Sequence, residues 1–154
     1  MINPKKEWDA NVDAVHVQLR LYKDRADSSP YERKNALLRR EAYRLIRGYL
    51  QAGHSEVLKR IVKSDVEDEK RYKVRLPFDV NPYLWGIWAF DPSQMFVDKQ
   101  MRSQMSKEFL YASIHNIPPY HLIGFLYQCG GPIRIAKKLK AYEREDWFPL
   151  SNLD

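Results

Sequence analysis

Apolar residues recur at steps of three and four along most of the chain, a spacing typical of amphipathic helices. In the first segment, one such stripe contains Trp8, Val12, Val15, Leu19 and Tyr22. The polar run from Asp24 to Ser29 then interrupts the pattern. The sequence therefore predicts a first helix that ends close to Tyr22.

A second helix is expected after Ser29, because Ser29-Pro30-Tyr31-Glu32 has the form of a capping box with proline at the first helical position. Its apolar stripe comprises Leu38, Ala42, Leu45, Ile46, Tyr49 and Leu50. Gly53 is a suitable stop signal, and Ser55 is expected to cap a short third helix. The charged residues 65–70 then predict a turn.

Residues 71–78, RYKVRLPF, alternate between polar and apolar side chains, which predicts a strand. Pro77, Asp79, Asn81 and Pro82 are expected to form a loop, which is followed by the uncharged run YLWGIWAF at residues 83–90. We expect this run to pair back as the second strand of a β-hairpin. Because two strands alone are marginally stable in water, the hairpin is expected to lie against helices.

The second half of the chain again has helical spacing. Asp91-Pro92-Ser93-Gln94 predicts the start of a long helix with one broad apolar face, which holds Val97, Met101, Met105, Phe109 and Ala112. Asn116-Ile117-Pro118-Pro119 is expected to end this helix. Residues 119–129 predict a short apolar helix, Gly130-Gly131 a stop, and Pro132 the start of a last basic helix.

These elements together predict a mainly α protein. We expect one compact helical domain over residues 1–154, with about five to six helices and a small two-stranded β-hairpin at about residues 71–90. A composition of 44% hydrophobic and 30% charged residues fits such a globular domain and excludes extensive disorder.

No stretch offers the roughly 20 predominantly apolar residues that a membrane span needs. The segment MINPKKEWDANVDAV lacks the apolar core of a secretory signal. The single cysteine, Cys129, excludes an internal disulfide and any multi-cysteine zinc site within the chain. We therefore expect an intracellular, cytoplasmic protein without a membrane span.

The net charge of +6 favours acidic partners. Most of this charge lies in residues 28–60, which contain eight basic and three acidic side chains. Arg33, Arg40, Arg44 and Arg47 lie within about 60° of one another on a helical wheel. Arginine suits phosphate because its planar fork donates two parallel hydrogen bonds. This stripe predicts a contact with nucleic acid or with an acidic protein. The alternative is a solvated or internally paired helix face.

The last two predicted helices, joined by CGGP, have the outline of a helix-turn-helix. The helix after the turn carries Arg134, Lys137 and Lys138 as candidate phosphate contacts. Any two helices joined by a glycine turn share this outline, and the apolar residues after the turn also fit a core. A DNA-reading role is therefore the less favoured interpretation of these residues.

Two aromatic groups are candidates for a protein interface, because tryptophan is a preferred anchor there. One contains Trp85 and Trp88 within the uncharged run, and the other contains Trp147 and Phe148 near the C-terminus. Burial in the core is the default interpretation of the first group.

The sequence offers no motif for catalysis. The four histidines lack paired spacing on a helix face, and no phosphate-binding glycine loop or nucleophile elbow is present. We expect no catalytic residues, no metal and no cofactor, although an enzyme site built from dispersed residues stays open. The leading hypothesis is a non-catalytic helical accessory or adaptor subunit that docks into a larger protein or nucleoprotein assembly. The alternative is a nucleic-acid-binding protein.

Overall fold

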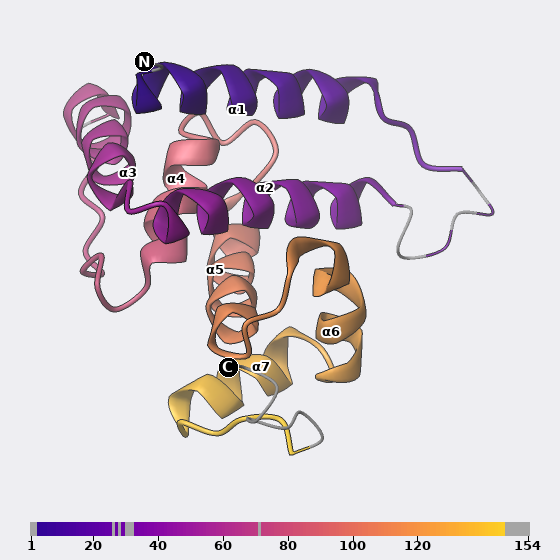
Figure 1. Ribbon diagram of the computed structural model, residues 1–154. Helices are drawn as coiled ribbons and strands as arrows, with labels where there is room; N and C mark the ends of the chain where they lie inside the picture. The colour runs from indigo at the N-terminus through magenta and orange to yellow at the C-terminus, as the bar shows by residue number, and fades with distance from the viewer. Residues whose placement is uncertain (1–2, 26, 28, 30–32, 71, 147–154) are drawn as a thin grey trace.

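The computed structural model describes residues 3–25, 27, 29, 33–70 and 72–146. Its α-helices are α1 (Pro4–Leu21), α2 (Lys34–Gln51), α3 (Ser55–Ile61), α4 (Pro82–Phe90), α5 (Lys99–Ile114), α6 (Leu122–Gln128) and α7 (Pro132–Lys140). A π-helix (Val62–Asp68) continues α3, and a short 3-10 helix (Pro119–His121) precedes α6. Figure 1 shows α1 and α2 side by side above α5, with α6 beside α5 and α7 across its lower end.

The first helix has the predicted apolar stripe. Asn3 caps it, since its side-chain oxygen accepts a hydrogen bond from the backbone N–H of Lys5 at 2.9 Å, and Pro4 follows. On the buried side, His16 Nε2 lies 2.8 Å from the carbonyl oxygen of Phe90, and Trp8 donates to that of Ala89 at 3.4 Å. The stripe therefore fixes α1 against the end of α4.

The predicted β-hairpin is wrong, because no strand occurs in the described part of the chain and the run at residues 83–90 belongs to α4. Asn81 caps this helix by accepting the backbone N–H groups of Tyr83 and Leu84 at 3.1 and 3.3 Å, and Pro82 takes the first helical position. Most of α4 is buried on all sides. A fully apolar run has no period that distinguishes a buried helix from a buried strand.

Residues 72–78 form an irregular segment instead of the first strand. Of the four alternating apolar residues only Val74 is fully buried, while Tyr72 and Leu76 are exposed. The backbone N–H of Val74 donates to the side chain of Glu67 at 2.9 Å, which replaces a ladder hydrogen bond. With α4 helical, this segment has no strand to pair with.

Several predicted helix ends also differ. The second helix begins at Lys34, so the predicted capping box does not cap it, and residues 30–32 lie outside the described residues. Ser55 is the first residue of α3 and not its cap, and the expected turn at residues 65–70 is largely π-helix. The long helix begins at Lys99, where the Asp98 side chain accepts the N–H of Met101 at 2.8 Å.

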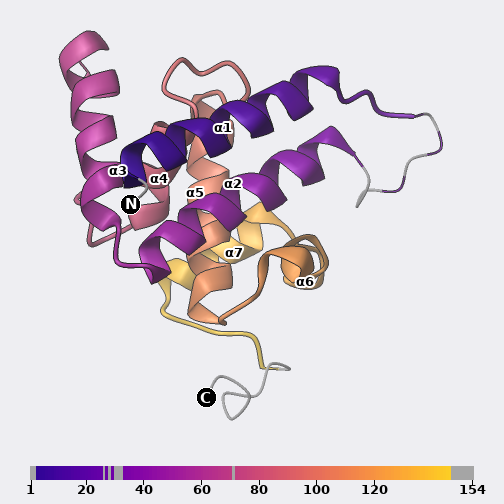
Figure 2. The same cartoon turned by 45° about the horizontal axis from the view of Figure 1, so that its top comes forward.

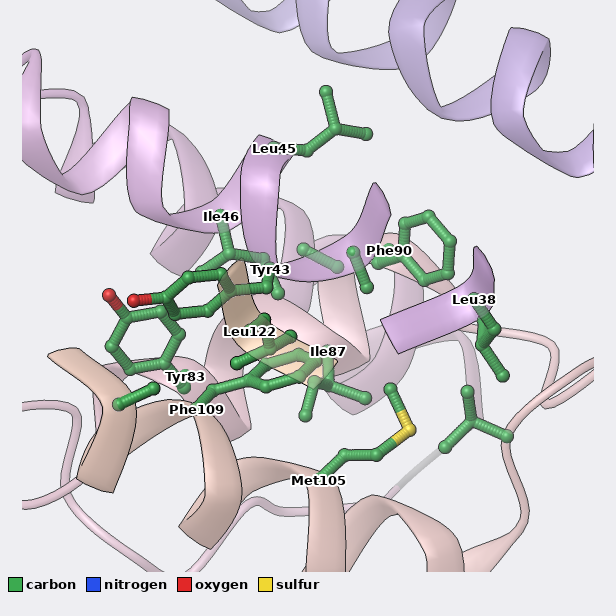
Figure 3. Packing of buried hydrophobic residues seen from close by; sticks show 14 of the residues in the cluster. Leu38, Tyr43, Leu45, Ile46, Tyr83, Ile87, Phe90, Met105, Phe109 and Leu122 are labelled. Atoms are coloured by element: carbon green, nitrogen blue, oxygen red, sulfur yellow. The ribbon is translucent and has the colours of Figure 1, made fainter. Parts of the chain in front are cut away.

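The core lies where α2, α4 and α5 meet (Figure 3). Tyr43 and Tyr83 stack with ring centroids 5.8 Å apart, and Phe109 contacts both rings. The hydroxyl of Tyr43 donates to the carbonyl oxygen of Ile117 at 2.7 Å, so a polar group at the edge of the core is satisfied. This aromatic group joins the middle of the chain to the turn that ends α5.

The predicted C-terminal helices are confirmed, and the turned view in Figure 2 separates them. Gly130 and Gly131 have φ of 89° and 98°, values that favour glycine, and Pro132 begins α7. Within α7 only Ile135 is fully buried. The helix ends at Lys140.

Candidate functional site

The predicted arginine stripe on α2 is largely engaged within the protein. Arg44 forms an ion pair with Glu41, 2.6 Å between Nε and Oε2. Arg47 donates to Asn116 Oδ1 at 2.8 Å and lies over the ring of Tyr43. Arg40 is half-buried and also has an interaction partner. These contacts match the alternative of an internally paired helix face better than an open phosphate-binding stripe.

Arg33 differs from the other three because it precedes α2 and is exposed. Its carbonyl oxygen accepts the first backbone hydrogen bonds of the helix, from Ala36 and Leu37. Among the described residues its guanidinium has no ion-pair partner.

The three predicted basic residues of α7 have separate environments. Lys138 is bound to the buried carboxylate of Glu145, at 2.6 and 2.8 Å from its two oxygens. Arg134 folds back over the glycine turn, so that a Cβ on Gly130 would lie 2.6 Å from Arg134 Cδ. Lys137 is exposed. Of the three residues, Lys138 is therefore neutralised within the protein, whereas Lys137 is open to solvent.

Glu145 also belongs to a buried polar cluster with His115 and Cys129. The backbone N–H of Glu145 donates to His115 Nε2 at 3.1 Å, which requires that Nδ1 carries the proton it donates to the Tyr111 carbonyl oxygen, 2.9 Å away. Burial lowers the pKa of His115 and raises the pKa of the Cys129 thiol. The thiol therefore stays protonated, and the cluster fastens the segment after α7 to α5 and α6.

The predicted aromatic anchors are only partly available. Trp88 is buried, with the Arg102 guanidinium 3.7 Å from its ring centroid, so it is a core residue. Trp85 is half-buried, and its Nε1 donates to the carbonyl oxygen of Leu76 at 2.8 Å. Trp147 and Phe148 lie outside the described residues.

An apolar depression of about 600 Å³ lies between α5, α7 and the segment before α4. We call it the α5–α7 groove; its lining residues are Leu76, Val80, Asn81, Lys107, Leu110, Ile133, Ala136, Lys137, Leu139 and Lys140. Ile133 is 73% exposed and Val80 is 57% exposed. Exposed β-branched residues on neighbouring segments, gathered around one depression, are typical of a docking surface.

Three lysines line this groove: Lys107 from α5, and Lys137 and Lys140 from α7. All three are exposed, and none forms an ion pair within the described parts of the chain. Among the residues that the structure describes, no acidic side chain lines the groove. The groove therefore combines an apolar floor with an uncompensated positive charge.

The sequence pattern predicts Lys137 as a binding residue but does not predict the rest of this groove. Ile133, Ala136, Lys137 and Lys140 follow the spacing i, i+3, i+4, i+7, which places them on one helix face. The buried Ile135 belongs with Lys138 on the face toward α5 and Glu145, and Leu139 lies at the border between the two faces, where it lines the groove. This division of α7 into two faces was readable from the sequence, whereas the contributions of Leu76 and Lys107 depend on the tertiary fold.

Comparison of the chain with protein-family models, with curated proteins and with solved structures found no match. Within the described residues, no group of three or more histidine, cysteine or acidic side chains is placed to hold a metal ion. None of the described helices combines the length and the apolar character required to cross a bilayer.

Proposed function

We propose that this protein is a non-catalytic helical accessory subunit that docks onto a protein partner through the α5–α7 groove. The observation that carries the proposal is Ile133, which is 73% exposed beside an apolar depression lined by three lysines that have no ion-pair partner among the described residues. An isolated exposed apolar residue needs no explanation, but a group of them rimmed by one sign of charge favours an interface. The half-buried Trp85, whose indole binds the carbonyl of the groove residue Leu76, supports one wall.

The charge of the groove determines the chemistry of the partner. An amphipathic helix would place its apolar residues, spaced at three and four, over Leu110, Ile133 and Leu139. Glutamates or aspartates along its flanks would then meet Lys107, Lys137 and Lys140. An acidic amphipathic helix is therefore the proposed occupant. The proposal keeps the intracellular, cytoplasmic setting expected from the sequence, where the single buried cysteine stays reduced.

A pair of labelled model peptides tests this assignment. The first is a helical peptide with leucines on one face and glutamates on both flanks, and the second has lysines in place of the glutamates. Fluorescence anisotropy should show saturable binding of the acidic peptide to the protein and at least about tenfold weaker binding of the basic one. Equal affinities would overturn the charge argument.

Two matched variants locate the binding. Ile133→Asp places a charge on the groove, whereas Tyr120→Asp changes a residue that is 75% exposed on the turn before α6. Both substituted side chains are on the surface, so both variants should keep the wild-type melting temperature. We expect Ile133→Asp to abolish peptide binding and Tyr120→Asp to leave it unchanged. Equal losses in both variants would refute the groove as the site.

Nucleic acid is the alternative partner, and the same assay tests it with labelled DNA and RNA. Phosphate contacts would produce an affinity that falls log-linearly with salt concentration. A slope that decreases when Arg40 and Arg44 become alanine would favour the arginine stripe of α2 over the groove. We expect weak binding that disappears at physiological salt, because Arg44 and Arg47 already have partners within the protein.

A further inference from the structure

A second cavity, of about 590 Å³, lies on another side of the protein, between the first half of α2, α6 and the glycine turn. Its apolar wall includes Ile123 and Leu126, which belong to the core, and the exposed ring of Tyr127. Cavities of about 300–1,000 Å³ with a mostly apolar lining and a few polar groups are typical of small-molecule sites.

A buried ion pair forms part of the wall of this cavity. Arg39 Nε donates to Glu108 Oε1 at 3.0 Å, and the two side chains are 15% and 6% exposed. The pair joins α2 to α5. A buried pair of this kind contributes little net stability, because desolvation of the two charges offsets their attraction. Its presence at a cavity wall is therefore better explained by recognition than by stability.

The geometry of the pair leaves hydrogen-bond donors for a ligand. Arg39 uses Nε for Glu108, and its two terminal amino groups make no hydrogen bond to the described residues. Arg39 lines the cavity, so these donors are the ones that we assign to an occupant. The two terminal amino groups of a guanidinium match the two oxygens of a carboxylate, sulfonate or phosphate.

The charge balance also favours an anion. Among the described residues, the charged side chains that line the cavity are Arg33, Arg39 and Glu108, which together carry one net positive charge. Glu108 compensates Arg39 alone, while Arg33 is exposed and has no ion-pair partner among the described residues. Burial raises the pKa of Glu108, and Arg39 opposes that shift without cancelling it. A carboxyl whose pKa is shifted by burial beside a charged partner in a cleft is a recognised sign of a functional site.

We propose that this cavity binds a small organic anion, with its acidic group on Arg39 and Arg33 and its apolar body against Ile123, Leu126 and Tyr127. This site is separate from the α5–α7 groove, and its occupant is a small molecule and not a protein segment. The proposal therefore does not depend on the proposed docking function.

Octanesulfonate is the probe for this site, because its acidic group stays ionised and its chain is apolar. Titration followed by amide NMR shifts should give saturable changes at Ala36, Gly130 and Gly131, which line the cavity. Octanol lacks the charge and methanesulfonate lacks the chain. We expect each of these to bind roughly ten- to a hundredfold more weakly, the range for losing a charged hydrogen bond or an apolar contact surface.

Variants of the cavity complete the test. Arg39→Gln combined with Glu108→Gln removes both charges together and leaves no unpaired buried ion, and Asn35→Trp fills the cavity mouth from an exposed position. Both should weaken octanesulfonate binding at least about tenfold, whereas Lys107→Gln in the other groove should not. Should the double variant fail to fold, octanesulfonate binding to Asn35→Trp and to the exposed Arg33→Gln still tests the proposal, and both variants should bind more weakly than wild type. Three outcomes would overturn the proposal. The first is that Asn35→Trp binds octanesulfonate with wild-type affinity, and the second is that the NMR shifts are confined to the α5–α7 groove. The third is that octanol binds as tightly as octanesulfonate.

Discussion

Gly86 of α4 lies directly against Ile46 of α2, so closely that a Cβ at residue 86 would be 2.8 Å from Ile46 Cγ1 and nearer still to Cγ2. Both residues are buried, and β-branched isoleucine has little rotamer freedom to move aside. We expect Gly86→Ala to lower the free energy of unfolding by about 1–3 kcal/mol, although alanine favours helix over glycine by about 1 kcal/mol. Urea denaturation measures this loss.

A size exchange between the two positions provides the control. Ile46→Ala alone should cost about 2–5 kcal/mol through the cavity it leaves. In the double variant Gly86→Ala with Ile46→Ala, the new methyl group of residue 86 has space. The double variant should therefore lose less stability than the sum of the losses of the two single variants. Strict additivity would mean that the clash between these residues is not what destabilises Gly86→Ala.

The ion pair between Arg39 and Glu108 predicts a second non-additive result. Arg39→Leu alone leaves a buried carboxylate unpaired and should destabilise the protein by about 3–5 kcal/mol. Arg39→Leu combined with Glu108→Leu removes both charges, so its stability should return to within about 1 kcal/mol of wild type. Chemical denaturation of both variants measures the two values. A double variant as unstable as the single one would show that the pair is itself a major source of stability.

Replacement of Asp91, which lies outside the helices, is expected to cause a large loss of stability. Its carboxylate is buried and accepts the backbone N–H groups of Met95, Phe96 and Val97 at 2.8–2.9 Å. Asp91→Ala leaves these donors without a partner and should lower the free energy of unfolding by about 2–4 kcal/mol. Asp98→Ala is the matched control, because it removes one exposed cap and should cost about 0.5–2 kcal/mol. Thermal and urea denaturation compare the two, and equal losses would contradict this role of Asp91.

His115 predicts a pH dependence of stability. Burial lowers the pKa of His115, and nearby Arg144 and Lys138 add to this, although the hydrogen bond to the Tyr111 carbonyl opposes it. The unfolded chain then binds the proton more readily than the folded protein. The stabilising contribution of neutral His115 is therefore complete above the unfolded pKa of about 6.5 and declines as the pH falls through the lower folded pKa.

The comparison with a non-titrating variant isolates this effect. His115→Gln should lose stability at neutral pH, but its free energy of unfolding should fall less than that of wild type between about pH 7.5 and about pH 5. Urea denaturation at each pH gives the two curves. Parallel curves would assign the pH dependence to other groups.

Helical periodicity was sufficient to predict α1, α2, α5 and the C-terminal helices, because each buries one face and exposes the other. It failed for α4, whose residues are apolar nearly all round. The signal that distinguishes a helix there was present as Asn81-Pro82, a capping residue followed by proline at the first helical position. The β-hairpin prediction instead places Asn81 and Pro82 in the loop of the hairpin.

The candidate sites show a different limit. Sequence spacing placed Arg44 and Arg47 on one helix face, but their partners Glu41 and Asn116 come from the neighbouring turn and from the end of α5. The spacing along the sequence shows on which face of a helix a charged side chain lies, but it does not show which residue of another element contacts that side chain. For the same reason Arg39 and Glu108, which are 69 residues apart, were not recognised as a pair.

The mode of attachment of α7 has a consequence for the native-state ensemble. This helix has one fully buried side chain, Ile135, and one salt bridge to the segment that follows, so it is expected to open at a lower free energy than the core helices. Its amide protons should therefore exchange early. The start of α7 borders the cavity proposed to bind an organic anion, and one face of α7 lines the α5–α7 groove. An occupant of either site would therefore suppress the opening of α7. Two ligands that share one fluctuating helix are thermodynamically linked, and each would then strengthen the binding of the other by the same factor.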